Sequence, residues 1–301
     1  MKIVFMGTPD ISAACLRALY ESGKHEVIAV VTQPDKPAGR GKNLKASAVK
    51  EYALEKGILI FQPKRANKGG FPDVLRGLNA DIFVVAAFGQ ILSGEILDIP
   101  KYGAINTHAS LLPEYRGAAP IQQAILDGRD KTGITIMQMD VGMDTGDMLL
   151  KHEVDITPDD TGGSLYAKLC HIAPIALLEA LDKIADGTIT HEKQDDTKAT
   201  YAPIITKEMA EIDWKKSAES IVNLVRGYNP FPGAYAHLFD KKIKVWKAAV
   251  IDEKLDSIRL CPKEGIFVPA GDKAVQLLEI TPPNGKKMSG ADFVRGFAEK
   301  E

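Results

Sequence analysis

The chain has 301 residues, of which 45% are hydrophobic and 26% are charged, and its formal net charge is −2. These values are ordinary for a globular protein, and the length suggests two domains of roughly 150 residues each. The charge balance argues against a generally basic nucleic-acid binder, and no apolar run approaches the roughly 18 residues of a membrane span. The apolar run after Met1 is too short for a signal peptide, so we expect a cytoplasmic protein without a membrane segment.

The two parts of the chain differ slightly in charge, and cysteines are few. Residues 207–301 contain 16 Lys and Arg against 14 Asp and Glu, a net of +2, whereas residues 1–206 contain 22 against 26, a net of −4. The sign of this difference fits a nucleic-acid role for the C-terminal part. Cys15, Cys170 and Cys261 are far apart, which fits reduced thiols and gives no zinc or redox spacing, so we expect no metal.

Short apolar runs alternate with helical patterns through the first part of the chain. Strands are predicted at 2–6, 26–32, 59–61 and 81–87, and helices at 10–21, where Asp10 can serve as the N-cap, 46–56 and 72–78. This alternation predicts an α/β fold, a Rossmann-like parallel sheet with helices on both faces. The segment Gly7-Thr8-Pro9-Asp10 lacks Gly-x-Gly-x-x-Gly spacing and no Walker A sequence is present, so we discount a dinucleotide or ATP enzyme.

The pattern changes beyond residue 190. Before it, we predict further strands at 102–107, 133–139 and 147–154 and helices at 119–126 and 163–185. The polar stretch 191–206 has few large apolar residues, which indicates a linker. A helix at 217–228 and short strands at 234–239, 243–250, 265–269 and 274–280 follow, a pattern typical of a small β-barrel. We therefore expect domains at 1–190 and 207–301, joined by a linker at 191–206.

The strand predicted at 102–107 leads into a polar pair. Side chains at i and i+2 of a strand share a face, so Asn106 and His108 should point the same way. A loop rich in Pro and Gly follows at 110–120, at a strand end where α/β proteins usually bind ligands. The alternative is a strand end whose Asn and His satisfy local backbone groups, and an isolated Asn-x-His would favour it.

A second polar loop follows the strand predicted at 133–139. In this loop Asp140 and Asp147 fit turn formers with solvated carboxylates. Asp144 differs in combination with His108, because a nearby carboxylate stabilises an imidazolium near neutral pH. Amide and imidazolium donors suit an oxyanion on a carbonyl carbon, where loss of one donor costs on the order of 2.7–4 kcal/mol. Because Gly-x-Ser-x-Gly is absent, direct transfer between two bound substrates is the better interpretation.

These motifs together resemble the methionyl-tRNA formyltransferase family. Folate-dependent formyltransferases share an Asn-x-His pair, a Ser-Leu-Leu-Pro loop and a distal Asp, which here are Asn106, His108, the loop 110–113 and Asp144. The segments 116–122 and 32–42 resemble the tRNA-specific branch in particular. The resemblance extends from Lys2 to about Arg295. It implies a Rossmann-like, folate-binding catalytic domain at 1–190 and an OB-like β-barrel that binds tRNA at 207–301.

By this resemblance, the chain transfers the formyl group of 10-formyltetrahydrofolate to the α-amine of methionine on initiator methionyl-tRNA. We also expect a monomer. Asn106 and His108 would bind the tetrahedral oxyanion, while Asp144 would support the charged His108 and help to remove the amine proton through water. The family more often has Tyr at the position of Phe88, a change that keeps the ring. The folate pocket implied by the resemblance comprises Phe88, Gly89, Gln90, Ile91, Leu92, Ser110, Leu111, Leu112, Pro113, Asp140, Val141 and Gly142.

The resemblance also implies where tRNA binds. The family's version of segment 35–42 is a flexible loop near the acceptor end, and its cations, Arg40 first, suit phosphate contacts. Composition alone would favour a cationic surface loop without a role, and the C-terminal lysines need no role beyond solvation. The predicted tRNA-binding residues are Lys36, Arg40, Lys42, Lys241, Lys242, Lys244, Lys286 and Lys287.

Three other interpretations remain open. A formyltransferase that acts on a small amine, such as a purine precursor or an amino sugar nucleotide, would use the same centre without needing the β-rich extension or the Arg40 loop. A hydrolase that releases formate would need a nucleophile or a water-directing residue that the sequence does not reveal. An inactive tRNA- or folate-binding module is disfavoured because Asn106, His108 and Asp144 are all present.

Overall fold

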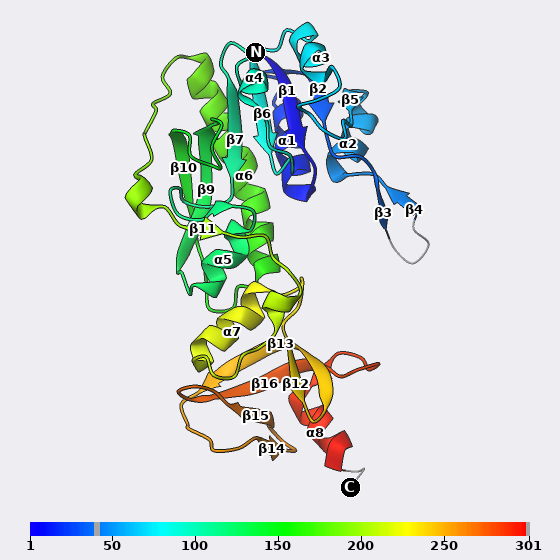
Figure 1. The fold of residues 1–301 in the computed structure, drawn as a ribbon, viewed down its shortest axis with the longest axis vertical. Helices are drawn as coiled ribbons and strands as arrows, with labels where there is room; N and C mark the ends of the chain where they lie inside the picture. Colours follow the sequence, from blue (N-terminus) through cyan, green and yellow to red (C-terminus); the bar gives the residue numbers. More distant parts are fainter. Residues whose placement is uncertain (39–42, 299–301) are drawn as a thin grey trace. The chain divides into compact units, whose positions relative to one another are not determined.

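The computed structural model describes residues 1–38 and 43–298, so Arg40 and Lys42 lie outside the described residues. The chain forms two compact units (Figure 1). The first contains Met1–Gly117, Thr132–Val154 and Ala167–Tyr201, and the second contains Ala118–Lys131, Asp155–Tyr166 and the described residues from Ala202 onward. The domain boundaries expected at 190 and 207 stay predictions. Residues 191–201 of the predicted linker belong to the first unit.

A seven-stranded sheet in the order β10-β9-β7-β6-β1-β2-β5 is the centre of the first unit. β1 pairs in parallel with β2 and β6, β2 with β5, and β6 with β7, which confirms the Rossmann-like architecture. The sheet is nevertheless mixed, because β9 pairs antiparallel with β7. The bounds are β1 (Lys2–Gly7), β2 (Glu26–Val31), β5 (Leu59–Phe61), β6 (Ile82–Ala86), β7 (Ala104–His108), β9 (Lys131–Gln138) and β10 (Met148–Asp155).

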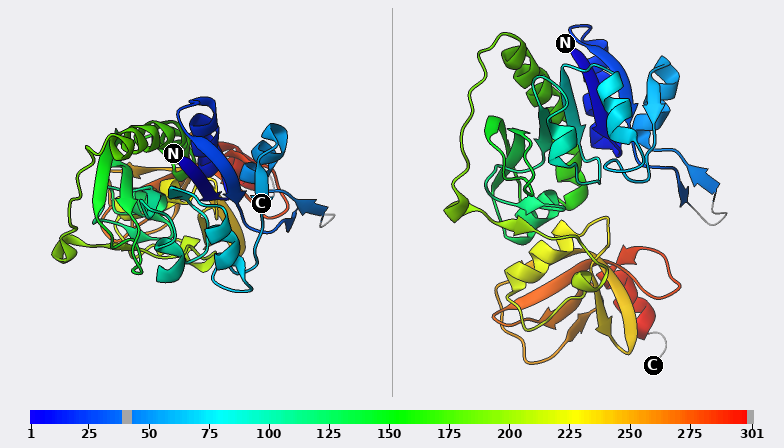
Figure 2. Two further views of the ribbon diagram at one scale, coloured as in Figure 1. Left: turned by 90° about the horizontal axis from the view of Figure 1, so that it is seen from above. Right: turned by 45° about the horizontal axis from the view of Figure 1, so that its top comes forward.

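Helices cover both faces of this sheet (Figure 2). Successive side chains of a strand point to opposite faces, and Val4 and Met6 of β1 share a hydrophobic cluster with residues of α3 and α4. On the other face, Lys24 follows α1 and pairs with Asp182 of α6 at 2.6 Å. The bounds are α1 (Asp10–Glu21), α2 (Ala48–Lys56), α3 (Phe71–Gly77), α4 (Gly94–Leu97) and α6 (Gly162–Ala185).

The structure corrects the sequence prediction in two ways. Pro9 is at the N-cap of α1 and Asp10 lies in the first turn, so the prediction that Asp10 caps this helix is wrong. Asp10 still places a negative charge near the positive end of the helix dipole. The shortest elements were missed because they contain too few residues to show periodicity. They are α4, β3 (Lys36–Ala38), β4 (Asn43–Lys45), β8 (Arg116–Gly117), β11 (Tyr201–Ala202), β14 (Arg259–Cys261), β17 (Met288–Ser289), and the 3₁₀ helices η1 (Asp196–Lys198) and η2 (Glu208–Ala210). The longer helix α8 (Gly290–Ala298) was also not predicted.

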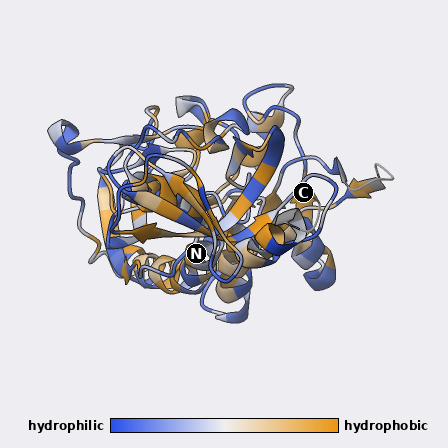
Figure 3. Ribbon diagram, turned by 90° about the horizontal axis from the view of Figure 1, so that it is seen from below, coloured by the Kyte–Doolittle hydropathy of each residue, from blue (hydrophilic) through white to orange (hydrophobic). Residues whose placement is uncertain are grey.

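An antiparallel sheet in the order β12-β13-β16-β15-β14 is the centre of the second unit, and β17 pairs with β16. The predicted β-rich C-terminal part is therefore confirmed. The helices carry hydrophobic and hydrophilic bands (Figure 3), as expected of elements that bury one face. The bounds are β12 (Tyr235–Leu238), β13 (Lys241–Ile251), β14 (Arg259–Cys261), β15 (Gly265–Pro269), β16 (Ala274–Thr281), β17 (Met288–Ser289), α5 (Pro120–Leu126), α7 (Ala218–Gly227) and α8 (Gly290–Ala298).

Among the described helices, α6 is the one whose length and hydropathy would allow it to cross a membrane. The core helix of a globular domain has the same properties, and Leu169, Ala173 and Leu177 of α6 are fully buried inside the protein. The length and hydropathy of α6 are therefore weak evidence for a membrane span. The expectation that the chain has no membrane segment stays a prediction.

Candidate active site

The polar pair Asn106 and His108 lies at the carboxyl end of β7, between β6 and β9. Asn106 is partly buried and His108 is buried, which fits side chains that share one face of a strand. Within residues 1–38 and 43–298, the Asn106 carboxamide has no hydrogen-bond partner. Its donors are therefore available to a ligand at this edge of the sheet.

The His108 ring is fixed by groups on both nitrogens. Nε2 lies 2.9 Å from the carbonyl oxygen of Tyr115, and because a carbonyl can only accept, Nε2 carries a hydrogen and donates it. Nδ1 lies 3.7 Å from Oδ2 of Asp144, so this nitrogen is the one that faces the carboxylate. The structure thus brings the predicted His108 and Asp144 together, and it makes Nδ1 the ring atom that can gain or lose a proton.

Three consecutive residues, Tyr115, Arg116 and Gly117, hold this centre. The Tyr115 carbonyl accepts from His108, and the Gly117 N–H donates to Oδ2 of Asp144 at 2.8 Å. This segment is itself anchored by Thr200, whose Oγ1 accepts from the Tyr115 N–H at 2.8 Å and whose carbonyl accepts from the Arg116 N–H at 2.9 Å. The relative position of His108 and Asp144 therefore depends on residues near 200, far away in the sequence.

Gln194 and Thr200 are residues of the site that sequence reasoning missed. Gln194 is buried and bonds to the side chain of Arg116 and to the carbonyl of Asp144. Both residues lie in a polar stretch that reads as a linker, and no motif marks them. One feature of the sequence could have pointed to a partner such as Gln194. Arg116 is a charged residue within the motif at 116–122, and a buried charged side chain needs a partner.

In the loop after β7, two of the predicted folate-binding residues, Ser110 and Leu112, have buried side chains. Ser110 is fully buried and its hydroxyl donates to the Glu114 carbonyl at 2.6 Å. Leu112 is buried with Met137 and Met148 in a small hydrophobic cluster. A contact of Ser110 or Leu112 with folate would therefore use main-chain atoms. Leu111 and Pro113, which alternate with them along the loop, are partly exposed.

The predicted folate loop after β6 has a buried base and an exposed tip. Phe88 and Leu92 belong to the core cluster of α3 and α4, and the Phe88 carbonyl accepts from Gln33 Nε2 at 3.1 Å. The Gln90 carboxamide is held by backbone groups: its oxygen accepts from the Ala66 N–H and its nitrogen donates to a carbonyl. Gly89 has a φ of +80°, and Ile91 is 81% exposed. Ile91 is thus the apolar side chain that this loop presents outward.

The third predicted folate loop is the turn at 140–144. Oδ1 of Asp140 accepts from the Gly142 N–H at 3.0 Å and from the Thr145 hydroxyl at 2.7 Å, so Asp140 shapes the turn as the sequence indicated. Val141 is 76% exposed, and a Cβ built on Gly94 would lie 3.3 Å from its Cγ1. The start of α4, which follows the loop after β6, therefore lies against the loop after β9, and each of these loops exposes an apolar side chain, Ile91 and Val141.

The predicted tRNA contacts lie in both units. In the first unit, Lys36 is exposed in β3, and Asp35 at the base of the β3–β4 hairpin bonds to Lys50 at 2.6 Å and to Gln62 at 2.8 Å. Hydrogen bonding to Lys50, and then to Gln62, lowers the pKa of Asp35. In the second unit, all five predicted lysines are exposed: Lys241, Lys242, Lys244, Lys286 and Lys287. Lys287 also forms an ion pair with Glu279.

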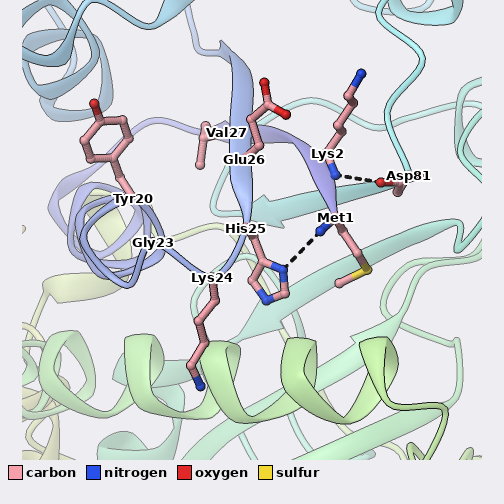
Figure 4. A pocket seen from close by; sticks show the side chains of 9 residues that line it. All are labelled: Met1, Lys2, Tyr20, Gly23, Lys24, His25, Glu26, Val27 and Asp81. Carbon is pink, nitrogen blue, oxygen red and sulfur yellow. Dashed lines mark hydrogen bonds between the residues drawn. The ribbon is translucent and has the colours of Figure 1, made fainter.

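A cavity of about 570 Å³ lies away from this site (Figure 4). It is lined by Met1 and His25 among others, which precede β1 and β2, so it lies at the amino edge of the sheet. Ligands of open α/β sheets bind at the carboxyl edge. Several polar groups of the cavity already bond to one another: the Lys2 N–H donates to Asp81 at 2.6 Å, and the Met1 ammonium contacts His25 at 3.4 Å. In the described part of the chain, no cluster of three His, Cys, Asp or Glu side chains could hold a metal ion.

Comparison with known proteins gives a consistent result. Residues 1–181 match the model of the family described as formyl transferase, and residues 204–298 match that of the formyl transferase C-terminal domain. The chain is 49% identical over 305 aligned positions to a methionyl-tRNA formyltransferase of Agathobacter rectalis, covering 100% of this chain and 98% of the relative. It is 48% identical to that of Clostridioides difficile, covering 98% and 97%.

Solved structures agree on the fold. The chain superposes on an N-formyltransferase from Helicobacter canadensis, solved with folinic acid and dTDP-3-aminofucose, with a TM-score of 0.69 and 18% identity. This match covers 96% of the chain and 100% of that structure.

Proposed function

The chain belongs to the formyl transferase family, and we propose that it transfers the formyl group of 10-formyltetrahydrofolate to the α-amino group of methionine on initiator methionyl-tRNA. We take the acceptor from relatives that align with the chain over nearly their whole length and are named methionyl-tRNA formyltransferase. The observation that carries the chemistry is that His108, at the end of β7, lies 3.7 Å from Asp144 of the loop after β9, and that Asn106 of the same strand has amide donors without a partner among residues 1–38 and 43–298.

The geometry supports a direct transfer. The α-amine attacks the formyl carbon, and the carbonyl oxygen becomes an oxyanion. The oxyanion then re-forms the carbonyl as the bond to the folate nitrogen breaks, and that nitrogen takes up a proton in place of the one that the amine has lost. The Asn106 amide and His108 supply the two donors to the oxyanion. Because Nε2 of His108 already donates to Tyr115, the donor for the oxyanion is Nδ1. At 3.7 Å, Asp144 is close enough to stabilise the imidazolium and too far to take the Nδ1 hydrogen bond for itself.

Asp144 has a second role in this proposal. Oδ2 is bound by the Gly117 N–H, so the other carboxylate oxygen can accept the amine proton through a water molecule. The charge of the ammonium that forms on attack is thus removed next to the centre. A positioned acid or base of this kind contributes roughly 10²–10⁴-fold to a rate.

The donor and acceptor would meet at the carboxyl edge of the sheet. The loops 88–92 and 140–142 present Ile91 and Val141, which suit the pterin ring, and we propose main-chain contacts at 110–113. Lys36 lies in β3, which follows β2, and we propose Lys36, Arg40 and Lys42 for the acceptor end of tRNA. The lysines of β13 and of the segment before β17 are proposed for backbone contacts elsewhere on the tRNA.

With this acceptor, we propose that the reaction serves translation initiation in the cytoplasm and that the protein is a monomer that needs neither metal nor membrane. A second candidate is formyl transfer to a small amine, such as an amino sugar nucleotide or a purine precursor. One observation favours it: the superposed Helicobacter canadensis structure holds a nucleotide-linked amino sugar. The two candidates share the same centre and differ only in the acceptor.

An acceptor comparison tests the proposal. The full-length protein is given 10-formyltetrahydrofolate and either charged initiator methionyl-tRNA, a nucleotide-linked amino sugar or a purine-pathway amine, and the formylated product is measured. We expect transfer to the charged tRNA alone. Transfer to a small amine in preference to the tRNA would contradict the proposal and support the second candidate.

A further inference from the structure

The carboxamide of Gln194 connects two loops that meet at the candidate active site. Its oxygen accepts hydrogen bonds from Nε and Nη2 of Arg116, at 3.0 and 2.9 Å. Its nitrogen donates to the carbonyl oxygens of Asp144 and Gly146, at 2.8 and 2.7 Å. A carboxamide offers two lone pairs and two hydrogens, so every polar group of this side chain is used.

The hydrogen-bond partners of Gln194 allow only one orientation of its amide group. A guanidinium only donates and a backbone carbonyl only accepts, so exchanging the amide oxygen and nitrogen would break all four bonds. Gln194 is 8% exposed and Arg116 is 2% exposed, so water cannot replace these partners. Arg116 also bonds through Nη2 to the carboxylate of Asp196 at 2.7 Å, which keeps its buried charge compensated.

Asp144 is a residue that needs such support. Its φ is +54°, in the left-handed region that residues other than glycine rarely adopt. Gln194 holds its carbonyl, and the N–H of Gly117, the residue after Arg116, holds its carboxylate at 2.8 Å. The two contacts therefore connect the backbone and the side chain of Asp144 to the same short segment, and that segment also supplies the Tyr115 carbonyl that orients His108.

We propose that Gln194 is a positioning residue for formyl transfer: without touching either substrate, it holds Asp144 so that the carboxylate lies beside Nδ1 of His108. This inference rests on the role proposed above for Asp144. Gln194→Ala should lower kcat about 10- to 100-fold, because a displacement of about 1 Å at a reacting group has an effect of this size. The KM values for both substrates should stay near those of the wild type, because neither substrate contacts Gln194.

Two further variants separate this role from a general effect on folding. In Gln194→Glu, the carboxylate can still accept from Arg116 but presents an oxygen to the carbonyls of Asp144 and Gly146. This variant should keep the fold and lose as much kcat as the alanine variant. Gln138→Ala is the matched control, because the Gln138 amide also donates to two carbonyls of the same unit, those of Tyr102 and Ala104, at 3.5 and 3.1 Å. It should keep the wild-type kcat.

A double-mutant cycle with Asp144→Ala is the deciding experiment, with kcat for formylation of charged initiator methionyl-tRNA as the readout. If Gln194 acts through Asp144, Gln194→Ala and Gln194→Glu lower kcat in the wild-type background and have no further effect in the Asp144→Ala background. Three outcomes would overturn the role of Gln194 while leaving the proposed centre intact: an equal loss of kcat in both backgrounds, an effect of Gln194→Ala on KM alone, or a wild-type kcat in Gln194→Ala. A wild-type kcat in Asp144→Ala would contradict the proposed centre itself.

Discussion

Two buried histidines lie at opposite edges of the same seven-stranded sheet. His108 ends β7 at the carboxyl edge, and His25 directly precedes β2 at the amino edge. Their side chains are 6% and 4% exposed, and each has a carboxylate nearby, Asp144 at 3.7 Å and Asp182 at 3.9 Å. By burial and by the nearest acid alone, the two sites would be judged equivalent.

The remaining neighbours make the two sites different. Both ring nitrogens of His108 face oxygen atoms, those of the Tyr115 carbonyl at 2.9 Å and of the Asp144 carboxylate at 3.7 Å. Nδ1 of His25 faces the Met1 ammonium at 3.4 Å, and burial, followed by this ammonium, lowers the pKa of His25. A buried His–Asp pair is therefore a candidate for chemistry only when a third group fixes the ring and the pair lies where ligands bind.

The largest expected effect tests the acid of the His108 pair. Asp144→Asn keeps an oxygen for the Gly117 N–H but removes the charge that stabilises the imidazolium, so kcat should fall roughly 10²–10⁴-fold. Asp147→Asn is the matched control from the same loop, because Oδ2 of Asp147 lies 3.6 Å from Nδ1 of His191 on an exposed surface. Steady-state formylation rates that fall equally in both variants would contradict the assignment.

A smaller effect is expected at the amide donor. Asn106→Ala removes a group that has no partner among residues 1–38 and 43–298, so the fold should be unaffected while one donor to the oxyanion is lost. We expect kcat to fall on the order of 10²–10³-fold, the usual cost of one such donor. The check is a kinetic comparison together with thermal unfolding. An unchanged kcat in a folded variant would remove Asn106 from the centre.

A weaker effect is expected at Arg40, the first of the cations proposed to contact the acceptor end of tRNA. Arg40→Ala should raise the KM for tRNA about tenfold and leave folate binding unchanged, and it should reduce the salt slope of tRNA binding by about one. Lys254→Ala, at an exposed lysine of the second unit, is the control. Unaltered tRNA kinetics and salt dependence in Arg40→Ala would remove this contact.

The smallest effect on activity is expected at the amino edge, where the readout is stability against pH. The pKa of His25 is lowered from its ordinary value of 6.5, so the unfolded chain binds a proton more readily than the folded one. The contribution of His25 to stability is therefore full above pH 6.5 and is lost as the pH falls through the lowered folded value. His25→Ala should show a smaller loss of Tm between pH 8 and pH 5 than the wild type. An unchanged pH dependence would contradict this reading of the pocket in Figure 4.

The sequence was sufficient for the parts of the fold that depend on local pattern. Alternating apolar runs gave the parallel sheet, and the i, i+2 spacing placed Asn106 and His108 on one strand end. The partners of that pair could not be derived in the same way. Gln194 and Thr200 reach the centre because the chain returns to the segment 115–117 after α6, and this return depends on tertiary packing rather than on any periodic pattern.

Side-chain burial was the other feature that sequence could not give. Phe88, Ser110 and Leu112 fall within motifs of the predicted folate pocket, but their side chains are buried, whereas Ile91 and Val141 are exposed. A motif identifies a segment, and only packing decides which of its side chains face a ligand.

The most direct test of the central claim compares His108→Ala with His25→Ala in one assay, formylation of charged initiator methionyl-tRNA by 10-formyltetrahydrofolate at equal concentrations of folded protein. The claim predicts that His108→Ala lowers kcat roughly 10²–10⁴-fold while His25→Ala keeps the wild-type rate. Equal rates in the two variants would contradict it.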